Sequence, residues 1–142
     1  MSIFVDYLSN PFSNLSNTPQ TIITTSTNSL WVQSLIITNT GEEDIRINFK
    51  FVRTTTNLSD PPSIIEIFLA KNFLVPSYKT ISSQKELVLY NTVDLVKVLG
   101  IPMNLQYTPE ISESLIMYSN GYTQKFDCSV IYSRLNELPM SS

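Results

Sequence analysis

The chain has 142 residues, a net charge of −3 and no histidine. Charged residues make up only 15% of the chain, against roughly 25% in an average soluble domain, and Ser, Thr and Asn replace them. The negative charge argues against nucleic acid, which is held by Lys and Arg. The lack of histidine and the single cysteine, Cys128, remove the commonest general base, any intrachain disulfide and any Cys/His metal site. We therefore predict no enzyme and no cofactor.

Residues 1–19 are predicted to form an N-terminal arm, because a short apolar start gives way to a polar run broken by Pro11 and Pro19. The start lacks a basic targeting region, and no apolar stretch approaches the roughly 20 residues of a membrane span, so we expect a protein made in a cytoplasm that binds no membrane. An apolar cluster on a segment too short to fold alone indicates docking on a neighbouring subunit. Two alternatives are an edge strand on its own sandwich and a disordered tail. The predicted docking residues are Ile3, Phe4, Val5, Tyr7 and Leu8.

The middle of the chain is predicted to form short strands. Residues 45–51 alternate four apolar with three polar residues, which is typical of a strand with one buried face. The β-branched run 30–39 precedes it, and the polar joint 40–44 predicts a hairpin. After a loop at 54–63, a strand is expected from residue 65 to near Lys71, and another at 85–90. The stretch 92–99 fits either a strand or one or two helical turns.

Near the C-terminal end, residues 114–119 and 122–132 flank Asn120-Gly121. Both residues tolerate positive φ, so the dipeptide predicts a hairpin with a type I′ turn. The whole pattern predicts an all-β fold, a single antiparallel β-sandwich that is jelly-roll-like. The predicted organisation is the arm 1–19, the sandwich 20–135 and a C-terminal tail 136–142. The expected core includes Trp31, Phe49, Phe126 and Val130.

Three polar features are interpreted as structural rather than chemical. Residues 42–44 are acidic, but they lack the spaced ligands and central glycine of a calcium loop and predict a solvated turn. Glu110 and Glu113 have surroundings typical of an exposed loop. Cys128 has no histidine to serve as its base, so we predict a buried thiol that acts as a small hydrophobic side chain.

Four segments follow one another in a distinctive order. They are the run 19–24, the strand 30–40 that ends in Asn39-Thr40, the alternating strand 45–49 and the closing segment 113–132. Over about residues 19–135 this order resembles small β-sandwich structural proteins of tailed bacteriophage virions. The segments 54–63 and 93–108 match nothing in that group. The resemblance implies a virion component without catalytic residues, such as a capsid decoration protein or a neck or tail accessory protein.

Two functions of different class follow. The first is a non-enzymatic structural protein that decorates or cements the capsid, neck or tail, is made in the host cytoplasm and ends in the virion. Its partners would be major capsid or neck and tail proteins, with further copies of itself in a homo-oligomer. The second is a free-standing binding module, for carbohydrate or as a fibre-attachment adaptor, which would need an aromatic patch among polar groups.

Overall fold

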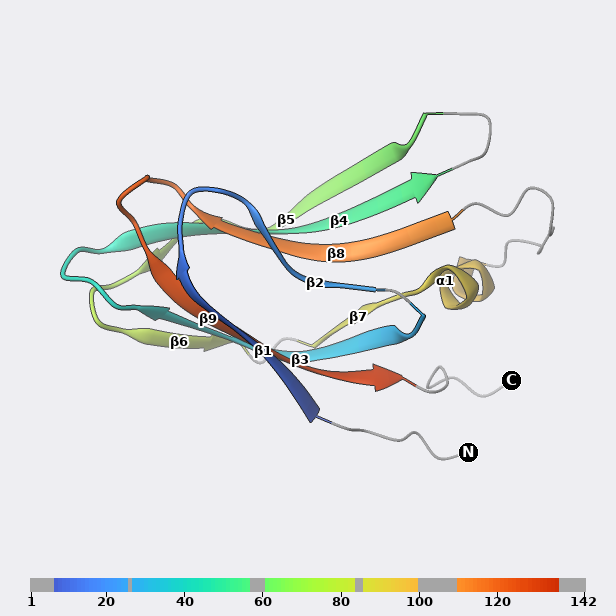
Figure 1. Cartoon of the computed structure of the whole chain (residues 1–142), viewed down its shortest axis with the longest axis horizontal. Helices are drawn as coiled ribbons and strands as arrows, with labels where there is room; N and C mark the ends of the chain where they lie inside the picture. Colours follow the sequence, from blue (N-terminus) through green and yellow to red (C-terminus); the bar gives the residue numbers. More distant parts are fainter. Residues whose placement is uncertain (1–6, 26, 57–60, 84–85, 100–109, 136–142) are drawn as a thin grey trace.

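The computed structural model describes residues 7–25, 27–56, 61–83, 86–99 and 110–135. Two antiparallel sheets pack face to face, with β4, β5 and β8 in the upper layer of Figure 1 and β3, β6 and β9 in the lower one. The all-β sandwich predicted from the sequence is confirmed. The elements are β1 (Tyr7–Leu15), β2 (Gln20–Thr24), β3 (Ser29–Asn39), β4 (Ile45–Thr56), β5 (Ser63–Val75), β6 (Thr80–Ser83), β7 (Leu87–Leu89), α1 (Thr92–Leu99), β8 (Glu110–Ser119) and β9 (Phe126–Leu135).

Two sheets divide the strands. Sheet A has the order β1-β9-β3-β6, with β7 also paired to β3, and sheet B has the order β2-β8-β4-β5. The core between them is formed by alternate residues of the long strands, among which Phe126, Leu115, Met117 and Val130 have no exposed surface. The predicted core positions of Phe126 and Val130 are therefore confirmed, and Phe49 is half-buried against that core.

Trp31 is not a core residue. Its neighbours Leu30 and Val32 are buried, and because side chains alternate along a strand, Trp31 points to the outer face of sheet A. There it is half-buried, with Ser133 and Val88 on the flanking strands.

Both predicted hairpins are wrong. β3 lies in sheet A and β4 in sheet B, and the same holds for β9 and β8, so each connection crosses from one layer to the other. Packed sheets lie only about 10 Å apart, a gap that connections of five or six residues span easily. Among the described residues, the non-glycine residues with positive φ are Asn14, Asn72 and Tyr78, so Asn120 lacks the type I′ conformation.

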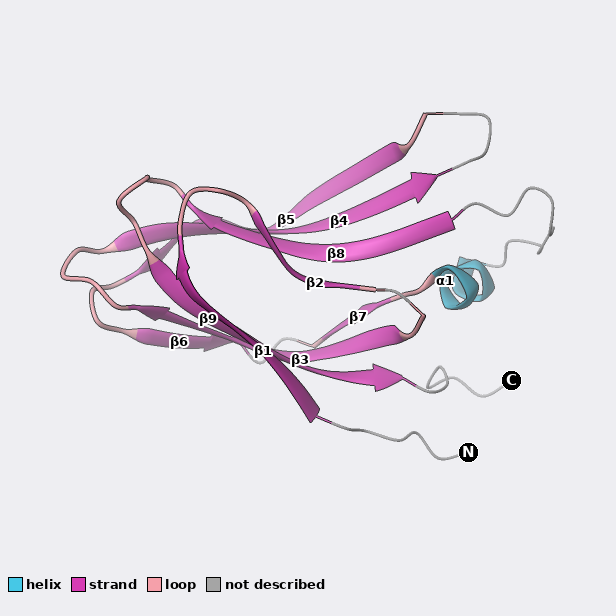
Figure 2. Ribbon diagram, viewed as in Figure 1, coloured by secondary structure: helices cyan, strands magenta, loops and turns pink. Residues whose placement is uncertain are grey.

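The ambiguous stretch 92–99 is a helix, α1, at the end of the sandwich beside β7 and β8 (Figure 2). The Asn91 side-chain oxygen accepts the backbone N–H of Asp94 at 2.8 Å, an N-terminal cap that a strand would not use. Leu95 then turns into the core, with 1% of its surface exposed. Among the described helices, none is long and apolar enough to cross a bilayer.

Candidate functional site

β5 is the strand whose side chains the rest of the described chain covers least. It is an edge strand of 13 residues. Seven large apolar side chains on it are each 41–61% exposed. We call this set the β5 surface: Ile64, Ile65, Ile67, Phe68, Leu69, Phe73 and Leu74.

The β5 surface has two faces, which the pairing with β4 identifies, because residues directly opposite each other share a face. Ile67 lies opposite Phe51 and Phe73 opposite Ile47, so both point toward the inside of the sandwich. Phe68 lies opposite Lys50, on the outer face. The strand is therefore apolar on both faces.

The inner side chains of β5 stay exposed because sheet A does not reach them. The strands at the facing edge of sheet A, β6 and β7, have only four and three residues. The β4–β5 ribbon diverges from the lower layer toward its upper right end in Figure 1. Edge strands of soluble monomers are normally short, covered, or broken by charges and bulges. β5 is long and uncovered along most of its length, and its large apolar side chains far outnumber its two charged ones.

An apolar cavity of about 450 Å³ lies behind β5, between the two sheets. Its wall on the β5 side is formed by Leu69, Ala70 and Phe73, and its opposite wall by residues such as Leu35 and Ile81. The cavity and the exposed inner face of β5 therefore form one continuous apolar opening on this side of the sandwich.

Two bulges shape β5. The register with β4 shifts between Ile47 and Phe49, and again between Phe49 and Lys50, so β5 carries extra residues at both places. Asn72 sits at the first bulge in the left-handed region, with a φ of 55°. Its backbone N–H donates to Asn48 Oδ1 at 3.1 Å, and its own side-chain oxygen accepts from Asn120 Nδ2 at 2.7 Å.

These amide contacts join β4, β5 and the connection after β8. Asn48 Nδ2 also donates to Asn120 Oδ1 at 2.6 Å, which completes a ring of three asparagine residues. The ring links the irregular part of β5 to β4 and gives the Asn120 side chain a partner on each of these strands.

β5 carries two charged residues, Glu66 and Lys71. Glu66 Oε1 lies 3.1 Å from Lys50 Nζ on β4, and its side chain is 51% exposed. Lys71 Nζ lies 5.1 Å from the ring centre of Phe68. Both charges therefore lie on the outer face, where solvent or a partner can reach them.

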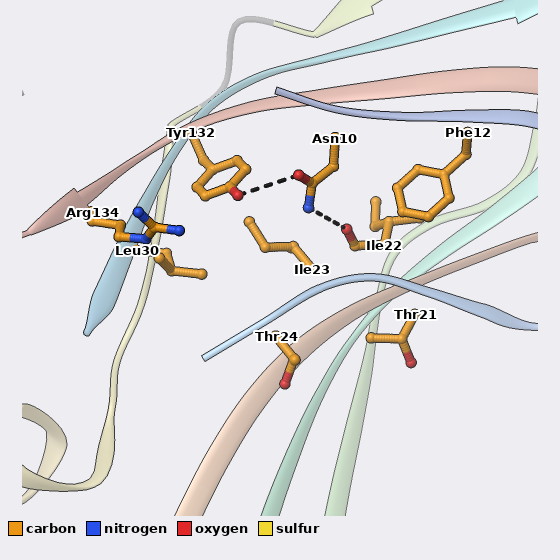
Figure 3. A pocket seen from close by; sticks show the side chains of 9 residues that line it. All are labelled: Asn10, Phe12, Thr21, Ile22, Ile23, Thr24, Leu30, Tyr132 and Arg134. Carbon is orange, nitrogen blue, oxygen red and sulfur yellow. Dashed lines mark hydrogen bonds between the residues drawn. The ribbon is translucent and has the colours of Figure 1, made fainter. Parts of the chain in front are cut away.

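The opposite side of the sandwich, between β1 and β2, is closed by a polar link. A cavity of about 300 Å³ lies there. Figure 3 shows Asn10 between Tyr132 and Ile22: its Oδ1 accepts from the Tyr132 hydroxyl at 3.2 Å, and its Nδ2 donates to the Ile22 carbonyl at 3.5 Å. One amide thus connects the two sheets here, and at the C-terminal end of β5 the Asn39 side chain does the same, since its Nδ2 donates to the Val75 carbonyl at 3.0 Å.

A buried polar cluster lies beneath α1, and its centre is Glu113, of which only 1% is exposed. Arg53 Nε donates to Glu113 Oε2 at 2.8 Å, and the backbone N–H of Tyr90 donates to Oε1 at 2.7 Å. The prediction of an exposed loop at Glu113 is wrong, because the residue lies on the inner face of β8. The contacts link β4, β8 and the segment before α1, which is a structural role.

The predicted docking residues separate into two groups. Leu8 is half-buried against the core of its own chain, where it lies opposite Tyr132, and docking on a neighbour stays a prediction for the part of its side chain that remains exposed. The backbone of Tyr7 pairs with Ser133, and β1 as a whole is the edge strand of the alternative prediction. Ile3, Phe4 and Val5 lie outside the described residues.

Cys128 is buried, as predicted, on the inner face of β9. Burial raises the pKa of its thiol to about 12, so the reactive thiolate is disfavoured at neutral pH.

The β5 surface was missed from the sequence. Residues 64–69 contain five large apolar residues with one charge among them, a pattern typical of a strand buried on both faces. The apolar run was visible in the sequence, but composition alone does not tell whether residues of the same chain or of a partner bury it.

Comparisons with known proteins found no matching family model and no matching curated protein. Among solved structures, the chain is similar to the infectious bursal disease virus VP2 subviral particle, with a TM-score of 0.48 and 12% identity over 92% of this chain and 32% of that chain. It is also similar to the infectious bursal disease virus Gx strain structure, with a TM-score of 0.47 and 11% identity over 94% of this chain and 32% of that one. The chain thus spans about a third of the length of these proteins. Likenesses at this level carry no argument about function.

Proposed function

We propose that this chain is a non-enzymatic structural subunit that joins a larger assembly through the β5 surface. The carrying observation is the set of seven exposed apolar side chains on one long edge strand. Contiguous apolar surface of this kind is rare on monomers and typical of interaction sites. The unpaired edge adds backbone donors and acceptors that a partner can satisfy.

We further propose that the assembly is a virus particle. This step rests on the sequence resemblance over about residues 19–135 to tailed-phage virion proteins, and on a surface poor in charge, which costs less to cover. The narrower roles are capsid decoration and a neck or tail accessory, with other virion proteins as partners. Mass spectrometry of purified particles tests the step, and a protein absent from every particle preparation would refute it.

Two substitutions on the outer face of β5, Ile64→Thr together with Phe68→Thr, are expected to abolish incorporation into the assembly. Thr keeps the β propensity of the strand while removing apolar contact area, so the melting temperature should change little. A hot-spot residue at the centre of an interface contributes about 2 kcal/mol or more, so the loss of one such residue should lower affinity by roughly 30-fold or more.

The matched control is Tyr122→Thr, which removes a side chain that is 77% exposed but lies in the connection between β8 and β9. It should leave incorporation unchanged. Incorporation is measured as the amount of protein per purified particle. Full occupancy by the β5 double variant would refute the β5 surface as the assembly site.

We propose that Ile3, Phe4 and Val5 provide a second contact with a neighbouring subunit. Deletion of residues 1–6 is then expected to reduce incorporation without lowering the melting temperature. Leu8→Ala serves as the contrast, because Leu8 packs against its own core and its truncation should lower stability by about 1 to 2 kcal/mol. A deletion variant that melts several degrees lower would assign these residues to the fold instead.

A further inference from the structure

We infer that the partner of β5 is the β5 strand of a second copy of this chain, paired antiparallel about a two-fold axis at Phe68. The inference rests on the proposed function and names one occupant of the β5 surface. It comes from the positions of the two charged residues of β5 relative to Phe68.

Distances along β5 are measured by the residues of β4 that lie opposite. Sequence numbers alone do not give these distances, because the two bulges add residues to β5. Phe68 lies opposite Lys50, and Glu66 lies opposite Val52, two residues along β4. In the other direction, Ala70 lies opposite Phe49 and Phe73 opposite Ile47, which leaves the bulged pair Lys71 and Asn72 opposite Asn48. Glu66 and Lys71 are therefore equally far from Phe68, on either side of it.

A two-fold axis at Phe68 makes use of this symmetry. In a two-fold interface, residue i of one copy contacts residue j of the other, and the same contact recurs in reverse. Phe68 then faces Phe68 of the second copy, and each Glu66 faces the second copy's Lys71. Opposite charges directly across a strand pair stabilise it, and both residues lie on the outer face, as cross-strand neighbours must.

The inner face matches in the same register. Ile65 lies opposite Arg53 of β4, three positions from Lys50, and Phe73 lies opposite Ile47, three positions the other way. The axis at Phe68 therefore places Ile65 of each copy beside Phe73 of the other. Phe73 lines the apolar cavity, so the second copy would cover part of its opening.

Other registers lose the charge complementarity. Moving the axis by one position places each charged residue opposite an apolar one. Moving it by two positions places Glu66 against Glu66 or Lys71 against Lys71, and like charges directly opposite are destabilising. The register at Phe68 is the one that pairs both charges of both copies.

The bulges are compatible with this pairing. In the proposed dimer, the regular half of β5 around Ile65 faces the bulged half around Lys71 of the second copy. Within the chain, β4 already accommodates the same bulged half by presenting a regular segment to it. The pairing would join two four-stranded B sheets into one continuous sheet.

The test reverses the charges one at a time in the full-length protein and measures mass by sedimentation velocity at low salt. The unaltered protein should be a dimer. Glu66→Lys gives a copy with two positive charges on β5, and Lys71→Glu gives one with two negative charges. Each alone places like charges at both contacts, so its dimer should weaken by about 30-fold or more.

An equimolar mixture of the two single variants should form a heterodimer, and the double reversal Glu66→Lys with Lys71→Glu should restore the homodimer. Lys50→Gln removes the ion pair of Glu66 within the chain but should leave dimerisation intact. Melting curves show that each variant is folded. Native mass spectrometry separates the heterodimer from the two homodimers.

A monomeric unaltered protein, or single variants that fail to combine, would overturn the second-copy inference. If in that case Ile64→Thr with Phe68→Thr still abolished incorporation, the proposed assembly role of β5 would stand with a different partner. If the charge reversals behaved as expected while incorporation was unaffected by that double variant, the dimer would stand and the assembly role would fall.

Discussion

Phe126→Ala is expected to lower the free energy of unfolding by about 3 to 5 kcal/mol. Phe126 is the first residue of β9 and has no exposed surface, and it lies between Asn39 on β3 and Leu15 on β1. Truncation would leave a cavity between the two sheets, where β9 begins, that its neighbours cannot fill. For a chain of this length the melting temperature should fall by roughly 10 °C.

Tyr122→Ala is the control, since it removes an aromatic ring four residues earlier in the chain that is 77% exposed. It should change stability by less than about 0.5 kcal/mol. Thermal and urea unfolding measure both variants. A Phe126→Ala protein that melts within a degree or two of the parent would contradict the position of this ring in the core.

Arg53→Met is expected to lower stability by about 3 kcal/mol, because it leaves the buried carboxylate of Glu113 without its charged partner. The Glu113 side chain is 1% exposed and that of Arg53 is 29% exposed. Because water reaches the arginine side of the pair, the loss of stability should lie at the lower end of the range of about 3 to 5 kcal/mol for broken buried ion pairs. Urea unfolding of the variant measures it.

The second step of this test adds Glu113→Gln to Arg53→Met. The neutral amide still accepts the backbone N–H of Tyr90, which Glu113 holds at 2.7 Å, and no charge is left buried. The double variant should therefore be more stable than Arg53→Met alone. If Glu113→Gln instead lowers the stability of Arg53→Met further, the cost does not come from an unpaired charge.

The strands themselves were predictable because their cause is local. Alternation along residues 45–51 and 126–132 identified the buried faces of β4 and β9, and Phe126 and Val130 are where the pattern placed them. Which sheet each strand joins is not a local property. The turn at Asn120-Gly121 has the composition of a hairpin, but Asn120 bonds instead to Asn48 and Asn72, residues far away in the sequence.

The burial of Glu113 and the exposure of β5 were unpredictable for a related reason. Glu113 is buried because Arg53, 60 residues earlier, lies across the sheet from it. β5 is exposed because β6 and β7, which face it, are short. In both cases a segment far away in the sequence decides whether the residue is buried, and the local sequence pattern does not show which segment that is.

The place of β9 between β1 and β3 has a consequence for the order of events on the ribosome. Until residues 126–135 have emerged, β1 and β3 cannot pair with β9, the strand that lies between them in sheet A. Their apolar faces stay exposed until then. Closing the pairing from Tyr7 to Ser133 joins residues far apart in the sequence, and such contacts slow folding. Nascent chains should therefore stay sensitive to protease and bound to chaperones until β9 has emerged, and fold in one step after that.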